Sequence, residues 1–261
     1  MKWAFVLLLL AAPAAAQPAD VARVELLPGW RTDSGTHMAA LSITLAPGWK
    51  TYWRAPGEAG IPPRFDWQRS ENLRSVAAHW PTPSVFTLSG YQTVGYADQV
   101  VLPLEITPAR AGAPVSLAGE VELGVCETVC VPITVTLAAT LPASGSPDPR
   151  IRAALAQRPE TARQAGVGSV SCEVAPIADG LRLTTRIELP ELAHGEAVVV
   201  ELADPGVWVS PAEATRQGGT LVASADLVPS SRTPFALDRS DVRLTVLGGG
   251  RGVEINGCRG G

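Results

Sequence analysis

Hydrophobic and polar residues alternate along most of the first half of the chain. The alternation runs through residues 23–27, 38–45, 49–53, 64–67 and 100–106. A period of two predicts half-buried β-strands. Proline and glycine pairs at 47–48, 56–57 and 62–63 predict turns between them. Pro103 falls inside the last of these stretches and predicts an edge strand or a bulge. The pattern is typical of an antiparallel sandwich.

The second half repeats this pattern after a break. Its strand-like stretches are residues 169–174, 181–189, 197–202, 220–228, 242–247 and 252–256, with Gly248–Gly250 as the turn of a final hairpin. Between the halves, residues 141–148 have the composition of a linker. Asp148 and Pro149 then predict the start of a helix over Arg150–Gln164, which Gly166 and Gly168 would end.

The predicted fold is therefore all-β. We expect two Ig-like antiparallel β-sandwich domains, at residues 17–141 and 168–261, joined by a linker and a short helix over residues 142–167.

The N-terminus has the features of a secretory signal peptide. Lys2 precedes a short apolar run, and Ala14–Ala16 form an A-x-A cleavage site before Gln17. The alternative, a membrane anchor, is disfavoured because the run is shorter than the roughly 20 residues that a bilayer requires. We expect residues 1–16 to be removed after Ala16 and the mature protein to be periplasmic, with no membrane span.

Charge and cysteine content narrow the class of protein further. The net charge is −4 and the chain has no basic run, which argues against nucleic acid or an anionic membrane as a partner. Four cysteines in an exported protein suggest two disulfides, with three possible connectivities. Because the linker separates the cysteines into two pairs, we predict Cys126–Cys130 and Cys172–Cys258.

Cys126 and Cys130 lie between two alternating stretches, residues 115–125 and 131–137. In an extended strand their Cα atoms would be about 13 Å apart, and a disulfide needs roughly 7 Å or less. They can bond only if the chain turns between them, which predicts a β-hairpin. So small a loop removes little entropy from the unfolded chain, so the bond is better suited to thiol–disulfide exchange than to structural support. Glu127 lies between them, and the sequence identifies no basic group that would favour a thiolate.

Cys172 falls in the first predicted strand of the second domain, and Cys258 comes just after the last one, residues 252–256. A bond between them would close a loop of roughly 85 residues and contribute about 4–5 kcal/mol. We predict a structural disulfide, with a second redox pair as the alternative.

Several motifs resemble a known family. These are Gly124–Pro132, with its cysteine pair followed by Val131-Pro132, together with Gly48–Trp53, Gly57–Pro62, Trp80-Pro81 and Gly95–Pro103. Their order is similar to that in the N-terminal periplasmic domain of the disulfide reductase DsbD. The two-domain length resembles the N-terminal region of ScsB-type relatives.

The resemblance implies a protein-disulfide reductase component without a cofactor. A separate membrane thiol reductase would reduce the pair, which would then reduce periplasmic thioredoxin-fold proteins. It also implies that Cys130 forms the mixed disulfide and that Cys126 resolves it. In the family an aromatic cap on a loop shields the pair. Here the corresponding loop is residues 84–92, which makes Phe86 and Tyr91 the candidates; Trp53 is a further candidate near the same edge.

Two other classes of function remain open. One is a non-catalytic Ig-like binding or chaperone-like module with two structural disulfides. The other is a periplasmic copper-handling protein that uses the reduced thiols. His37, His79 and His194 are scattered and the chain has only two methionines, so we expect no metal site.

Overall fold

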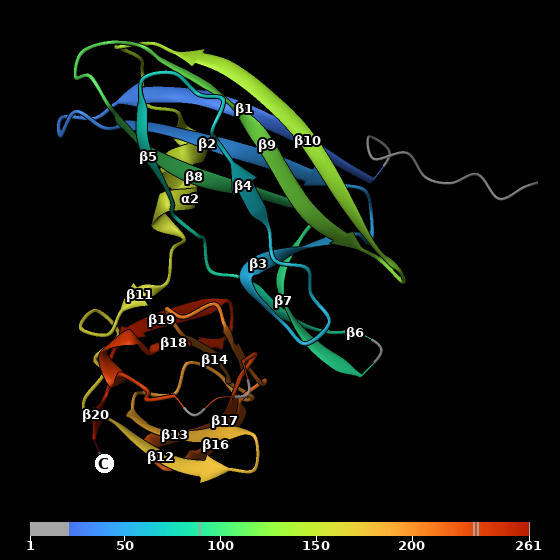
Figure 1. The fold of residues 1–261 in the computed structure, drawn as a ribbon, viewed down its shortest axis with the longest axis vertical. Coiled ribbons are helices and arrows are strands. Elements are labelled where there is room, and N and C mark those ends of the chain that lie inside the picture. The colour runs from blue at the N-terminus through green and yellow to red at the C-terminus, as the bar shows by residue number, and fades with distance from the viewer. Residues whose placement is uncertain (1–20, 89, 232, 234, 261) are drawn as a thin grey trace, which may run out of the picture.

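The structure is a computed structural model that describes residues 21–260, except 89, 232 and 234 (Figure 1). The predicted signal peptide, residues 1–16, lies outside the described residues. No helix in the described part of the chain is long and apolar enough to cross a bilayer. The prediction of an all-β protein with two sandwiches is confirmed.

The first sandwich consists of two antiparallel sheets. One has the order β1-β2-β8-β5, formed by β1 (Ala22–Arg31), β2 (His37–Leu45), β8 (Gln99–Pro108) and β5 (Leu73–Ala78). The other has the order β10-β9-β3-β7-β6, formed by β10 (Cys130–Leu141), β9 (Val115–Cys126), β3 (Lys50–Gly57), β7 (Tyr91–Ala97) and β6 (Ser84–Leu88). β4 (Arg64–Asp66) also pairs with β9.

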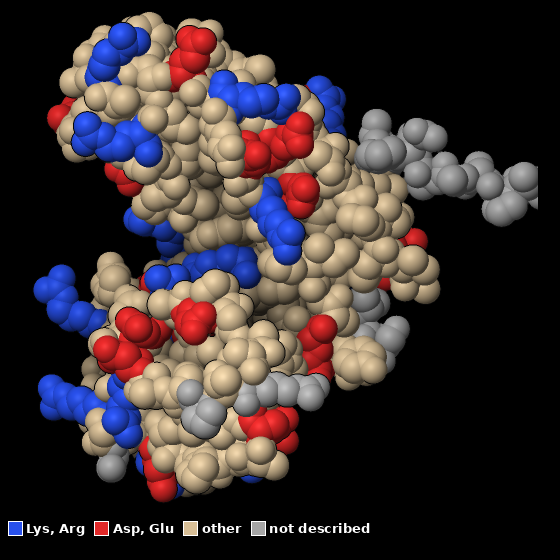
Figure 2. Space-filling view, viewed as in Figure 1, with Lys and Arg blue, Asp and Glu red and all other residues tan. Residues whose placement is uncertain are grey.

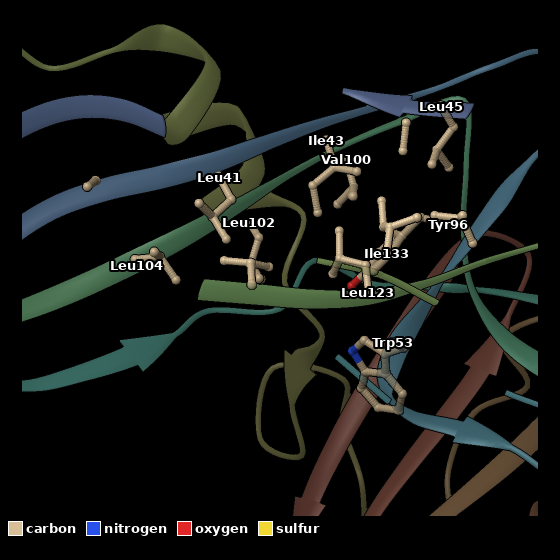
Figure 3. Close-up of a cluster of buried hydrophobic side chains, with 14 of the residues drawn as sticks. Leu41, Ile43, Leu45, Trp53, Tyr96, Val100, Leu102, Leu104, Leu123 and Ile133 are labelled. Carbon is tan, nitrogen blue, oxygen red and sulfur yellow. The ribbon is translucent and has the colours of Figure 1, made fainter. Parts of the chain in front are cut away.

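The core of this sandwich follows the alternation in the sequence. On β9, Val115, Leu117, Val121 and Leu123 are all buried, and the intervening side chains are more exposed. Figure 3 shows part of this cluster, with Leu41 and Ile43 from β2, Leu102 and Leu104 from β8, and Leu123 and Ile133 from the other sheet.

The second sandwich also has two sheets. One has the order β11-β19-β18-β14, from β11 (Glu160–Thr161), β19 (Arg251–Asn256), β18 (Arg243–Gly248) and β14 (Ala197–Glu201). The other has the order β15-β17-β13-β12-β20, from β15 (Val207–Val209), β17 (Thr220–Pro229), β13 (Gly180–Glu188), β12 (Val170–Ile177) and β20 (Arg259–Gly260). β16 (Glu213–Gln217) pairs with β17, and a short 3-10 helix spans Arg239–Asp241.

The predicted helix is shorter than expected. α2 spans Pro149–Ala156, and Asp148 caps it by accepting a hydrogen bond from the Arg150 backbone N–H. The helix ends early because Pro159 disfavours helical backbone at the residue before it and lacks a backbone donor. The expected helix to Gln164 is therefore wrong, and Glu160–Thr161 instead form β11, which pairs in parallel with β19.

Pro103 lies in a central strand, so the prediction of an edge strand or a bulge is wrong. β8 pairs with β2 on one side and β5 on the other. The Pro103 carbonyl accepts from the His79 N–H, just beyond the last β5 pair at Ala78↔Leu104. The nitrogen and carbonyl of one strand residue point to the same side. The N–H that Pro103 lacks would therefore point toward β5 at a position where that strand has already ended.

The two sandwiches contact each other beneath β3. The Arg54 guanidinium donates to Glu201 on β14 at 2.8 Å and to Glu254 on β19 at 2.7 Å. Leu247 of β18 belongs to the first hydrophobic core. On one side of this contact a hollow of about 920 Å³ separates the sandwiches, and Figure 2 shows basic side chains on its walls.

Candidate functional site

The cysteine pair closes the tip of the longest hairpin. β9 and β10 pair in continuous register from Val115↔Leu141 to Cys126↔Cys130, and residues 127–129 form the turn. The Cys126 and Cys130 Cα atoms lie 4.1 Å apart, and their sulfurs form a disulfide. The structure thus contains both the hairpin and the bond that the sequence predicted.

The two sulfurs differ in accessibility. Cys126 is 1% exposed, whereas Cys130 is half-buried. Val129 and Val131 on either side of Cys130 are 70% and 38% exposed, and β10 is the outermost strand of its sheet. An incoming thiol therefore reaches Cys130 more readily than Cys126.

Tyr52 provides a polar contact to the accessible sulfur. Its hydroxyl lies 3.1 Å from Cys130 Sγ, and because a disulfide sulfur has no proton, the hydroxyl is the donor. The ring fits between two glycines, since a Cβ at Gly60 or at Gly124 would come within 2.9 Å of ring carbons. Burial raises the pKa of the Tyr52 phenol, which keeps the hydroxyl protonated.

Lys50 occupies the position opposite the buried sulfur. β3 pairs with β9 in the register Lys50↔Cys126, so the two side chains start on the same face of the sheet. The Thr51 hydroxyl donates to the Gly124 carbonyl at 2.9 Å and holds the strands together here. The Lys50 ammonium lies 5.4 Å from the centre of the Phe86 ring.

The three aromatic cap candidates lie in different surroundings. Phe86 on β6 is half-buried, and its ring contacts the ammonium of Lys50, the residue that pairs with Cys126. Tyr91 begins β7 and is 53% exposed. Trp53 is fully buried in the core (Figure 3). Its ring lies 4.1 Å from the Arg54 guanidinium carbon.

Tyr52 and Lys50 were missed as site residues from the sequence. The available signal was the alternation in Gly48–Trp53, which places residues 50 and 52 on one face and Trp53 on the other. Which face meets the cysteines depends on the pairing of β3 with β9, two strands that are separated along the chain by β4 to β8.

The second cysteine pair has a different environment. Cys172 on β12 is fully buried and forms a disulfide with Cys258, with Cα atoms 5.7 Å apart and a sequence separation of 86. The bond ties the segment between β19 and β20 to β12. The Arg239 side chain donates to the Cys172 carbonyl at 3.3 Å, which adds a further contact over this pair.

Comparison with known proteins agrees with this arrangement. Residues 22–142 match the family model described as thiol:disulfide interchange protein DsbD, N-terminal. The N-terminal periplasmic domain of ScsB from Proteus mirabilis is similar in structure, with a TM-score of 0.70 and 25% sequence identity, over 94% of this chain and 96% of that one. Comparison with curated protein sequences gives no match. Residues 22–142 are therefore a DsbD/ScsB-type N-terminal domain, a module of thiol–disulfide exchange.

Proposed function

We propose that the protein is a periplasmic relay module that carries two electrons on the Cys126/Cys130 pair. A separate membrane thiol reductase supplies the electrons, and thioredoxin-fold proteins receive them. The observation that carries the proposal is the exposed hairpin tip, where a half-buried Cys130 lies between exposed valines and accepts a hydrogen bond from Tyr52.

Reduction of the pair begins at the accessible sulfur. A thiolate of the membrane reductase attacks Cys130 Sγ, the Cys126–Cys130 bond breaks, and its electron pair leaves on Cys126 as a thiolate. The second thiolate of the reductase then attacks the reductase sulfur of the mixed disulfide. This releases Cys130 as a thiolate and leaves the reductase with a disulfide.

Transfer to the acceptor reverses these roles. The Cys130 thiolate attacks the acceptor disulfide and forms a mixed disulfide, while one acceptor sulfur leaves as a thiolate. Cys126 then attacks Cys130 Sγ, restores the intramolecular bond and releases the reduced acceptor. The Tyr52 hydroxyl stabilises the Cys130 thiolate, because a neutral donor favours the charged form of the sulfur.

The β6–β7 hairpin acts as the aromatic cap in this proposal. Phe86 covers the pair through the Lys50 side chain, and Tyr91 extends the apolar surface toward solvent. Trp53 supports β3 from the core rather than contacting a partner, because it is fully buried.

Trapping of the mixed disulfide tests the relay. Cys126→Ser removes the resolving sulfur, so we expect covalent adducts through Cys130 in periplasmic extracts, released by a reductant and identifiable by mass. Cys130→Ser is the matched control and should give few or none. Absence of adducts from both variants contradicts the relay; adducts through Cys126 instead would reverse the assigned roles.

The compartment is tested separately. Residues 1–16 act as the export signal in this proposal, and cleavage after Ala16 makes Gln17 the first residue of the mature chain. We expect the intact mass of the periplasmic protein to correspond to a chain beginning at Gln17. A protein that retains its N-terminus in the membrane fraction would contradict this.

A further inference from the structure

The use of lysine in this chain is uneven. Lysine and arginine total 21, yet the only lysines are Lys2 and Lys50. Every other Lys or Arg position in the expected mature chain is an arginine. The single lysine lies on β3 directly opposite Cys126.

The Lys50 side chain is held by contacts on two sides. Its ammonium lies 5.4 Å from the centre of the Phe86 ring, within the range of a cation–π interaction. It also donates to the Gly48 carbonyl at 3.4 Å. These contacts keep the ammonium beside the hairpin tip.

Few other charges act on this face. Strands β6, β7 and β10 contain no charged residue. The neighbouring carboxylates are Glu127 in the turn, whose Oε1 would lie 3.2 Å from a Cβ on Gly48, and Asp98, which follows the Lys50 partner Ala97. Lys50 is therefore the one positive charge that the described strands β3, β6, β7 and β10 place beside the pair at this end.

We propose that Lys50 is a positioning residue that stabilises Cys126 as the leaving thiolate, and so directs attack to Cys130. When an incoming thiolate bonds to Cys130 Sγ, the electron pair of the broken bond moves to Cys126 Sγ, on the residue that pairs with Lys50 across β3 and β9. A leaving thiol with a lower pKa departs faster. This inference rests on the proposed function, and it assigns the two sulfurs different polar neighbours: Tyr52 for Cys130 and Lys50 for Cys126.

Direct titration of Cys126 tests the inference. In Cys130→Ser, with the Cys172–Cys258 bond intact, Cys126 is the only free thiol, and its ionisation is followed by thiolate absorbance. Adding Lys50→Met should raise the Cys126 pKa by about half a unit to one unit, while Lys50→Arg should leave it near the parent value. In the matched Cys126→Ser background, Lys50→Met should shift Cys130 less. Equal midpoints for the Lys50→Met and parent proteins overturn the inference, as do equal shifts for the Met and Arg variants.

The unique lysine also allows a test on the folded wild-type protein. Acetylation removes the Lys50 charge and reductive dimethylation keeps it, and apart from Lys50 only the N-terminal amine of the mature chain reacts. The acetylated protein should be reduced by dithiothreitol about threefold more slowly than the dimethylated one, because leaving-group reactivity follows thiol pKa. Equal rates overturn the inference.

Failure of this inference and failure of the relay give different results. If the relay fails, Cys126→Ser captures no partner regardless of residue 50. If only the Lys50 assignment fails, Cys126→Ser still captures partners through Cys130, and the Cys126 pKa does not change in Lys50→Met.

Discussion

The two disulfides of this protein have opposite surroundings. Cys126–Cys130 joins residues four apart at a hairpin tip, next to exposed valines and a buried phenol. Cys172–Cys258 joins residues 86 apart, and Cys172 is fully buried. Figure 1 shows the hairpin tip and β20 on opposite sides of the molecule.

The two disulfides differ in loop length and burial, and these differences suit them to different roles. A disulfide that closes a short loop removes little conformational entropy from the unfolded chain. The hairpin bond can therefore open at a small cost in stability. A long loop constrains the unfolded chain strongly, and burial keeps other thiols away. One chain can therefore carry one bond that is suited to exchange and one that is suited to persist.

Removing the Cys172–Cys258 disulfide should change the free energy of unfolding more than any other substitution considered, and the two disulfides should differ in the size of the loss. Replacing Cys172 and Cys258 with alanine should lower the free energy of unfolding by about 4–5 kcal/mol, and replacing Cys126 and Cys130 by about 2 kcal/mol. Urea denaturation of the two double variants measures the difference. Similar losses would remove the distinction between the two roles.

A smaller loss in the free energy of unfolding is expected when the ion pairs of Arg54 between the two sandwiches are removed. Arg54→Met leaves Glu201 and Glu254 without their cation, and these side chains are only 17% and 29% exposed. We expect a loss of about 2 kcal/mol, below the value for a fully buried pair. Arg182→Met is the control, because Arg182 is 54% exposed in its pair with Asp226 and should cost less than about 1 kcal/mol. A larger loss for Arg182→Met would show that the Arg54 cluster does not tie the sandwiches together.

The sandwiches should also differ in their response to acid. His37 in the first is fully buried, and burial lowers the pKa of its imidazole. The unfolded chain then binds a proton below about pH 6.5 that the folded chain does not, so stability falls as pH drops through this value. Hydrogen exchange at pH 7.5 and 5.5 should show weaker protection in the first sandwich at low pH, and His37→Gln should reduce that difference. A loss of protection confined to the second sandwich would contradict this.

Tyr52→Phe should have a small effect on stability. It removes the hydrogen bond to Cys130 Sγ, worth about 1 kcal/mol, without changing the ring. In the Cys126→Ser background the Cys130 pKa should rise, because the thiolate loses a donor. Tyr91→Phe is the matched control at a 53% exposed position. A Cys130 pKa that moves equally in both variants would contradict the role of Tyr52.

The sequence predicted the features that depend on local pattern. Alternation around Cys126 and Cys130, together with the reach of a disulfide, was sufficient for the hairpin. It was not sufficient for Lys50 and Tyr52, whose importance depends on long-range pairing of β3 with β9. The helix was predicted too long because Pro159, which disfavours helical backbone at the residue before it, was not taken as its end.

Strands β5, β6 and β7 were not predicted, although they complete the sheets of the first sandwich. β5 and β6 are short, and residues 84–92 were interpreted as a loop. Their strand conformation depends on pairing with β8 and β7 rather than on a strong local pattern.

A redox titration of the folded wild-type protein tests directly whether the two disulfides have different roles. After equilibration in dithiothreitol buffers of graded potential, free thiols are alkylated and located by peptide mass. We expect a range of potentials in which Cys126 and Cys130 are alkylated while Cys172 and Cys258 remain bonded. Reduction of both pairs at one midpoint, or of the Cys172–Cys258 bond first, would contradict it.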